Sequence, residues 1–348
     1  MLRSERLLNI QGQGGSPLAF IRCVISITAL LFGLAAFAPQ TYAQSAMLLW
    51  TLRYDGPAGG DDFGYGLTVD SSGNVFVTGE SSNGANNDWA TIKYSSAGVP
   101  LWTNRYNGPG NGDDYGFGVA VDNGGNVFVA GASTAINGYS DFATIKYSNG
   151  GVPLWTNHYN GPGNREDGGS VVTLDGSGNV IAAGSSSNGT NSDFATIKYS
   201  GEGVLLWTNR YDGPGNGADS LAAMGVDGSG NVFVTGISAG SGTGGDYATV
   251  AYSDAGVPMW TNRFTAQGIS GDFPTALAVD ASGDVFVTGY STAYGSLNYT
   301  TIKYSDAGVP LWTNRYDGPT QNEDQARDMA LDDSGAVIVA GDSWDGVS

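Results

Sequence analysis

The sequence writes one unit of about 52 residues six times, and this period constrains the fold more than any other feature. Six tryptophans mark it at spacings of 52 or 53 residues: Trp50, Trp102, Trp155, Trp207, Trp260 and Trp312. A second block recurs at 67–79, 119–131, 172–184, 224–236, 277–289 and 329–341, and a third at 88–94, 141–147, 193–199, 246–252 and 298–304. A period of this length is typical of propellers, whereas β-solenoid coils usually repeat in roughly 20–30 residues.

Each unit contains four strand signals separated by glycine-bearing turns. In the first unit they are residues 66–70 (A), 75–78 (B), 88–94 (C) and the segment around Trp102 (D). Strand B is apolar throughout, which predicts burial on both faces. Strand D follows Pro100, and proline cannot donate to a ladder, so D is expected at the sheet edge. Gly73 supplies the positive φ of a tight A–B hairpin.

These patterns predict an all-β fold, a β-propeller of four-stranded antiparallel blades. Five blades are complete, at 61–106, 113–159, 166–211, 219–264 and 271–316, and a sixth, incomplete one combines 323–341 with 47–54. The chain could also be a truncated larger propeller. In an A–B–C–D sheet, strands B and D run the same way, so 47–54 cannot pair beside the last hairpin in the regular pattern. We therefore expect unpaired strand edges and self-association through the incomplete blade.

The repeated strings resemble a known family. V-D-x-S-G-N-V-F-V-T-G, D-[FWY]-A-T-I-K-Y and W-T-N-R-Y recur in phase over residues 47–341. Together they resemble the bacterial SBBP-type β-propeller repeat. The resemblance implies a secreted or cell-surface propeller and no single activity.

The N-terminus carries the pattern of an export signal. Arg3, Arg6 and Arg22 precede an apolar run at 23–38, and the small-x-small site 41–43 follows. The run is shorter than the roughly 18–20 residues of a membrane span, so residues 1–43 are predicted to be a signal peptide cleaved before Gln44. An uncleaved anchor is the alternative. The mature chain is then secreted or held at the cell surface, without a membrane span.

The strongly negative net charge limits which partners the chain can bind. The 348 residues have a formal net charge of −19, which becomes −21 when three Arg and one Glu leave with residues 1–43. Phosphate binding needs a basic surface, so no nucleic-acid partner is expected. All four lysines lie in strand C, and strand D holds Arg53, Arg105, Arg210, Arg263 and Arg315. We interpret these residues as charges that discourage edge-to-edge pairing and lie over Trp and Tyr; a basic belt that contacts a partner is the alternative.

The sequence lacks residues that common catalytic and zinc sites require. His158 is the only histidine and fills a slot held by arginine in other units, while Cys23 is the only cysteine. Neither a zinc site nor a histidine-activated nucleophile is therefore expected. One acid recurs in every unit: Asp62, Asp114, Asp167, Asp219, Asp272 and Asp324. A per-blade acid is expected to cap the loop before strand A, and a ring of divalent-cation ligands, with Ca²⁺ as the ion, is the alternative.

Binding candidates are sought where the repeat breaks. The B–C loops vary most and share one end of the blades with the recurring acids, and binding residues concentrate on such loops. The candidates are Arg165, Arg327, Tyr139, Tyr290, Tyr294 and Trp344. We expect an exported, non-enzymatic β-propeller that serves as a binding or structural module, with an unknown protein or glycan partner. The alternatives are a lectin-like module that binds glycans through the B–C loops and a cation-dependent hydrolase on the acidic face.

Overall fold

The chain folds into repeated antiparallel sheets. The computed structural model describes residues 48–343 apart from 243, 267–270, 294–295 and 319–322, and all regular structure in this part is β-strand. Five sheets have four strands in chain order and a sixth has two. The first sheet holds β1 (Asp62–Val69), β2 (Val75–Ser82), β3 (Asn87–Tyr94) and β4 (Pro100–Tyr106). The predicted all-β propeller of four-stranded blades is confirmed.

The later sheets repeat this order. The second contains β5 (Asp114–Val121), β6 (Val127–Thr134), β7 (Ser140–Tyr147) and β8 (Pro153–Tyr159), and the third β9 (Asp167–Leu174), β10 (Val180–Ser187), β11 (Ser192–Tyr199) and β12 (Leu205–Tyr211). The fourth contains β13 (Ser220–Val226), β14 (Val232–Ala239), β15 (Gly245–Tyr252) and β16 (Pro258–Phe264), and the fifth β17 (Asp272–Val279), β18 (Val285–Ala293), β19 (Ser296–Tyr304) and β20 (Pro310–Tyr316). The sixth contains β21 (Asp324–Leu331) and β22 (Val337–Ser343).

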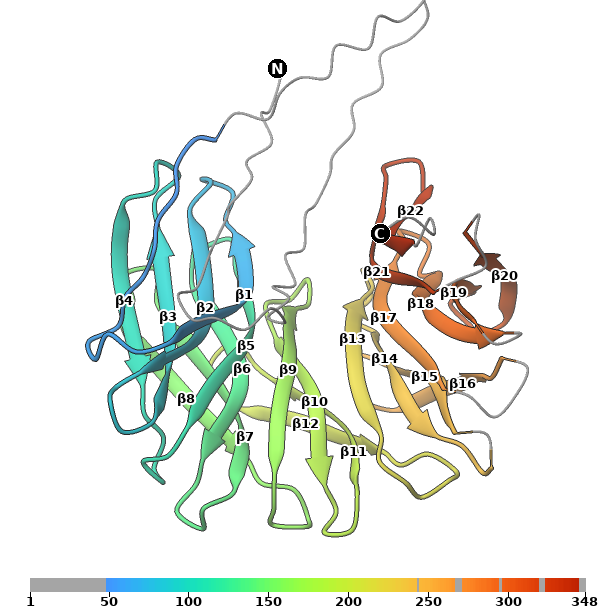
Figure 1. Ribbon diagram of the computed structural model, residues 1–348, viewed down its shortest axis with the longest axis horizontal. Helices are drawn as coiled ribbons and strands as arrows, with labels where there is room; N and C mark the ends of the chain where they lie inside the picture. Colours follow the sequence, from blue (N-terminus) through green and yellow to red (C-terminus); the bar gives the residue numbers. More distant parts are fainter. Residues whose placement is uncertain (1–47, 243, 267–270, 294–295, 319–322, 344–348) are drawn as a thin grey trace, which may run out of the picture.

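The sheets follow one another along an arc, with the first strand of each on its inner side (Figure 1). Successive inner strands lie against each other, from β1 and β5 through to β17 and β21. The second strand of each complete blade is buried on both faces, as its apolar sequence predicts; Phe76 is fully buried. The fourth strand pairs only with the third and forms the expected edge.

Each A–B hairpin is held by its first residue. Gly73 adopts φ +77°, and its amide donates to the Asp70 carbonyl at 2.9 Å. The Asp70 carboxylate accepts the Ser72 and Asn74 amides, both at 2.9 Å, and the Asn74 side chain at 2.7 Å. The D-x-S-G-N segment is therefore a side-chain-capped turn.

Strand A begins earlier than the sequence predicts, at Asp62 instead of residue 66. The pairing of β1 with β2 shifts between Gly64 and Gly66, and this bulge breaks the alternation on which the expected boundary rested. The same shift recurs in the other inner strands, for example between Gly116 and Gly118.

Tryptophans join neighbouring blades. The Trp102 indole N–H donates to the Asn149 carbonyl of the next blade at 3.0 Å, and its ring covers Gly151. Trp155, Trp207 and Trp260 make the same contact with the following C–D turn at 2.9–3.1 Å. Gly151 has φ +82°, and a Cβ there would lie 2.8 Å from Trp102 Cγ, so the turn needs glycine for both its conformation and its contact.

The ends of the chain differ from our expectation. Residues 48–54 contain no strand and do not pair with β21 or β22. Instead Trp50, Leu52 and Tyr54 pack on the first sheet, and the Trp50 N–H donates to the Ser96 carbonyl at 3.3 Å. The segment thus lies against the C–D turn of the first sheet, as the strand D tryptophans of the first four blades lie against the C–D turn of the next blade. In the described part of the chain, β21 and β22 pair only with each other.

The predicted signal peptide, residues 1–43, lies outside the described residues. Within the described ranges no helix is long and apolar enough to cross a membrane.

Candidate functional site

The B–C loops and the loops before strand A share one end of the blades, where neighbouring units touch. Asn86 Nδ2 of one B–C loop donates to the Asn111 carbonyl of the next unit at 2.7 Å, and the Asn87 amide donates to Asp113 Oδ1 at 2.9 Å. Asn191 makes the corresponding contact with the Gly217 carbonyl at 2.8 Å. Any function carried by the variable loops therefore belongs to this face.

The six recurring aspartates hold the loop that precedes their own strand. One oxygen of each accepts a backbone amide six residues earlier at 2.6–2.8 Å; the amides belong to Gly56, Gly108, Gly161, Gly213, Ala266 and Gly318. The other oxygen of Asp167 accepts the Ser187 amide at 2.9 Å, which ties strand B to the same loop. The contacts are those of the expected capping role.

Burial sets the electrostatics of these carboxylates. Desolvation raises the pKa of Asp114 and raises that of Asp272 to about 6. Asp272 is fully buried, and its Oδ1 has no hydrogen-bond partner. A buried carboxylate with one oxygen lacking a partner favours its protonated form.

One acidic group in the described ranges has the spacing of metal ligands: Asp193, Asp212 and Asp219. Two of its members are already engaged. Asp193 receives Arg210 Nη2 at 2.6 Å, and the two oxygens of Asp219 accept the Gly213 and Ala239 amides at 2.7 and 2.9 Å. Asp212 is the exposed member of the group, and a divalent cation there stays a prediction.

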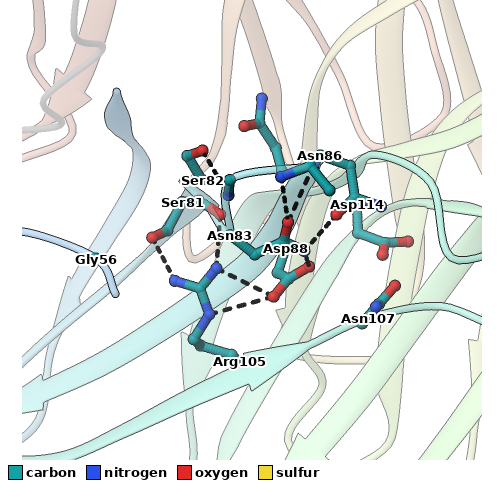
Figure 2. Close-up of polar contacts among 12 residues, drawn as sticks. Gly56, Ser81, Ser82, Asn83, Asn86, Asp88, Arg105, Asn107 and Asp114 are labelled. Atoms are coloured by element: carbon teal, nitrogen blue, oxygen red, sulfur yellow. Dashed lines mark hydrogen bonds and ion pairs between the residues drawn. The ribbon is translucent and has the colours of Figure 1, made fainter. Parts of the chain in front are cut away.

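The strand D arginines clamp adjacent units, which the sequence interpretation missed. Figure 2 shows the Arg105 guanidinium between Ser81 and Asp88. Its Nη2 lies 3.0 Å from Asp88 Oδ2 and 2.8 Å from the Ser81 carbonyl, Nη1 donates to Ser81 Oγ, and Nη1 lies 3.4 Å from the Tyr54 hydroxyl of the preceding unit. Arg210 and Arg263 repeat this arrangement with Asp193 and Asp246 at 2.6 and 2.8 Å.

Two of the four strand C lysines, Lys93 and Lys198, are buried, and the other two, Lys146 and Lys303, are half-buried, so the interpretation of them as exposed edge charges is wrong. Lys198 is 1% exposed; it lies 2.8 Å from Asp175 Oδ2 and also pairs with Asp254. Lys93 is 4% exposed and lies over the Phe76 ring at 5.0 Å. These charges join strand C to the A–B and C–D turns instead of guarding an edge.

The predicted binding residues fall into separate pairs. Arg165 lies over the Tyr139 ring at 5.6 Å, Tyr290 stacks on Phe273 at 5.0 Å, and Arg327 Nε lies 2.8 Å from Asp342. The first pair lies between the second and third blades, the second in the fifth blade, and the third in the two-stranded sheet. Tyr294 and Trp344 lie outside the described residues.

A row of aromatic rings on the first two inner strands was not predicted. Phe63 and Tyr65 of β1 stack at 6.4 Å, Tyr65 meets Phe117 of β5 at 5.2 Å, and Phe117 stacks on Tyr115 at 6.0 Å. Phe63 is 39% and Phe117 36% exposed. We call Phe63, Tyr65, Tyr115 and Phe117 the aromatic row.

The signal for this row is present in the sequence. The residue three positions after the recurring aspartate is aromatic in the first two units only, and the others have Ser170, Ala222, Thr275 and Arg327. An aromatic residue, Phe273, occurs in strand A of the fifth unit as well, so the repeat pattern alone does not single out these two blades.

A buried acid lies beneath the row. Glu80 is 6% exposed and accepts hydrogen bonds from the Tyr65 hydroxyl and from Asn87 Nδ2, the latter at 2.8 Å. Burial, followed by the Glu80 hydrogen bond and charge, raises the pKa of Tyr65 far above its usual value. The ring is thereby fixed as a neutral donor. Other units have Ala132, Ser185, Ile237, Tyr290 or Asp342 at this position.

Solved structures with a similar fold are distant in sequence. The periplasmic gluconolactonase PpgL of Pseudomonas aeruginosa is 14% identical with a TM-score of 0.49, and the alignment covers 79% of this chain and 77% of PpgL. Sqt1 of Chaetomium thermophilum is 12% identical with a TM-score of 0.51, and the alignment covers 84% of this chain and 69% of Sqt1. At these identities the likeness concerns the fold alone. No curated protein matches the chain.

The family comparison agrees with the repeat pattern. Residues 52–86 match the model of the SBBP β-propeller repeat, and this stretch spans the end of the first tryptophan motif, strand A and strand B. The same blocks recur in every later unit with the same strand order. Residues 52–86 therefore match an SBBP β-propeller repeat, and the later units repeat its sequence blocks and strand order.

Proposed function

We propose that this chain is an exported, non-enzymatic β-propeller that acts as a binding module at the cell surface or outside the cell. The aromatic row carries the proposal, because it is partly exposed, breaks the repeat and has a buried acid behind it. Contiguous apolar surface with convergent polar groups is typical of binding sites. The repeated polar residues, in contrast, serve loops and blade contacts.

The use of the acids favours binding over catalysis. Each recurring aspartate accepts a backbone amide, and the single histidine is hydrogen-bonded to Tyr106 at 2.9 Å. A general acid or base needs to reach a substrate proton, and these groups are directed at the protein itself. Turnover of lactone, phosphotriester and glycoside substrates, with and without calcium, tests the hydrolase alternative, and we expect none.

Residues 1–43 and the family support export. Intact-mass analysis of protein secreted by a bacterial host should give a chain that starts at Gln44. A secreted chain that retains residues 1–43 would contradict the cleavage, and retention inside the cell would contradict export.

The binding role is tested with matched variants. We would screen the purified mature chain on glycan and peptide arrays beside the variant Phe63→Ala/Phe117→Ala. The control is Leu101→Ala/Leu154→Ala, which removes two outer-strand side chains that are each 51% exposed. A ligand that is lost with the aromatic pair and kept with the control supports the module. Equal binding by all three proteins would place the site elsewhere.

A lectin-like function is the second candidate. Near-parallel rings favour it, because Phe63 and Tyr65 are inclined by only 10° and Tyr115 and Phe117 by 17°, which presents flat apolar faces. Glycan binding that depends on Phe117 would support this candidate at the aromatic row, whereas binding that depends on Tyr139 or Tyr290 would assign it to the B–C loops.

A further inference from the structure

Three blades contain the same receptor for an arginine side chain. Strand C supplies a carboxylate, the end of strand B supplies a serine carbonyl and hydroxyl, and the preceding unit supplies a tyrosine hydroxyl. In the fourth blade Arg263 lies 2.8 Å from Asp246, 3.0 Å from the Ser238 carbonyl and 3.1 Å from the Tyr211 hydroxyl. A planar guanidinium with several fixed donors matches this set of acceptors.

The second blade keeps the receptor but lacks the arginine. Asp141, Ser133 and Tyr106 occupy the receptor positions, and His158 occupies the arginine position. The shorter imidazole reaches Tyr106, at 2.9 Å between Nε2 and the hydroxyl oxygen, and is exposed to solvent.

Asp141 is left without its cation. Asp141 is 9% exposed, and its Oδ1 has no hydrogen-bond partner. In the three blades that keep the arginine, the guanidinium binds the other oxygen, Oδ2, and the second blade has no arginine for that oxygen. Two nearby cations are engaged elsewhere: Lys146 donates to the Gly201 carbonyl at 2.7 Å, and Arg165 lies over the Tyr139 ring. A buried carboxylate that has lost its ion-pair partner is costly, so the position favours an incoming cation.

The fifth blade shows the opposite change. It keeps Arg315 but has Asn298 for the carboxylate and Phe264 for the tyrosine, and Arg315 keeps the serine contact, to Ser291 Oγ at 2.6 Å. The fifth blade thus has the guanidinium without two of its acceptors, whereas the second blade has the acceptor residues without the guanidinium.

From this contrast we propose that the second blade carries an open receptor for a guanidinium group, lined by Asp141, Ser133 and Tyr106 and closed in the other blades by their own arginine. The ligand is the arginine side chain of a partner polypeptide or a small guanidino compound. The receptor is separate from the aromatic row, so the test of the receptor does not depend on the proposed function.

Thermal unfolding of the full chain tests the receptor. Methylguanidinium is compared with methylammonium at equal ionic strength, each at millimolar concentration. Ligand at ten times its Kd should raise the Tm of the wild type by about 2–6 °C, because only the native state binds. His158→Arg fills the receptor and should abolish this response while raising the Tm without ligand.

Asp141→Asn is the second variant, and it decides the question even if His158→Arg does not fold. It should remove the methylguanidinium response. Capped Gly-Arg-Gly and Gly-Lys-Gly peptides distinguish the sources: stronger binding of the arginine peptide than of methylguanidinium indicates a polypeptide ligand, and the reverse indicates a small molecule. Equal responses to methylguanidinium and methylammonium, or an Asp141→Asn variant that responds like the wild type, would overturn the proposal.

Discussion

Asp167 illustrates why the recurring acids could be interpreted from sequence and the arginines could not. Its partners, the Gly161 and Ser187 amides, belong to its own unit, and a polar residue before a strand is a familiar loop cap. Arg105, in contrast, draws its partners from two strands and from Tyr54 of the preceding unit. The spacing within one unit carries no information on how two units face each other.

Asp167→Asn should destabilise the protein by about 1–3 kcal/mol, because the amide group presents a donor to one of two backbone N–H groups that need an acceptor. Urea unfolding measures the change. Glu166→Gln is the control, since Glu166 is the exposed acid beside it and should shift stability by less than about 0.5 kcal/mol. Equal effects of the two variants would contradict the capping role.

Asp272 should make stability fall as the pH rises through about 6. Burial raises its folded pKa to about 6, above the unfolded value of 3.8, so the native state binds more protons between these values. Its contribution is present below pH 3.8 and is lost as the pH rises to 6 and beyond. Asp272→Asn keeps an acceptor for the Ala266 amide, so the difference in unfolding free energy between wild type and variant should change over this window. A difference that stays constant with pH would contradict it.

At the scale of elements, the apolar run of strand B and the turn glycines predict the four strands of a blade, while the start of strand A depends on pairing. The bulge between Gly64 and Gly66 is created by register against β2, which no local pattern records. Residues 48–54 carry a complete strand D motif and yet form no strand, because strand D requires a strand C beside it. Local sequence specifies these elements only where their partner is present.

Gly151→Ala should weaken the contact between the first and second blades. An alanine at this left-handed φ costs about 1–2 kcal/mol. Its Cβ would also lie 2.8 Å from Trp102 Cγ, which is too close. Gly178→Ala is the matched control, since Gly178 has φ +80° but nothing within 4 Å of the added Cβ. The Tm of Gly151→Ala should lie several degrees below that of the control, with a change in tryptophan fluorescence. Equal Tm values would contradict the role of the tryptophan contact.

At the scale of the whole molecule, the arc ends in a sheet of two strands. Ile338 of β22 is 42% exposed, whereas the second strand of the complete blades is buried. An open strand edge with apolar side chains favours pairing with another chain. The number of repeats predicts the incomplete blade. The position of residues 48–54 was not predictable, because it depends on which sheet places a C–D turn beside Trp50 in the folded arc.

Self-association should therefore depend on β22. Light scattering of the purified chain at increasing concentration should show oligomers, and Ile338→Lys should reduce them because an edge lysine opposes strand pairing. Leu154→Lys on the outer strand β8 is the control and should leave association unchanged. A wild type that remains monomeric at high concentration would contradict the prediction.

The tryptophan contacts have a consequence for how such chains change over generations. Each Trp reaches only the turn of the following unit, 46 or 47 residues ahead, so every blade depends on its immediate neighbours. A duplicated or deleted unit then creates a junction identical to the ones already present. Genes of this kind can vary in the number of copies without inventing a new interface, while single copies, such as the one that carries His158, diverge alone.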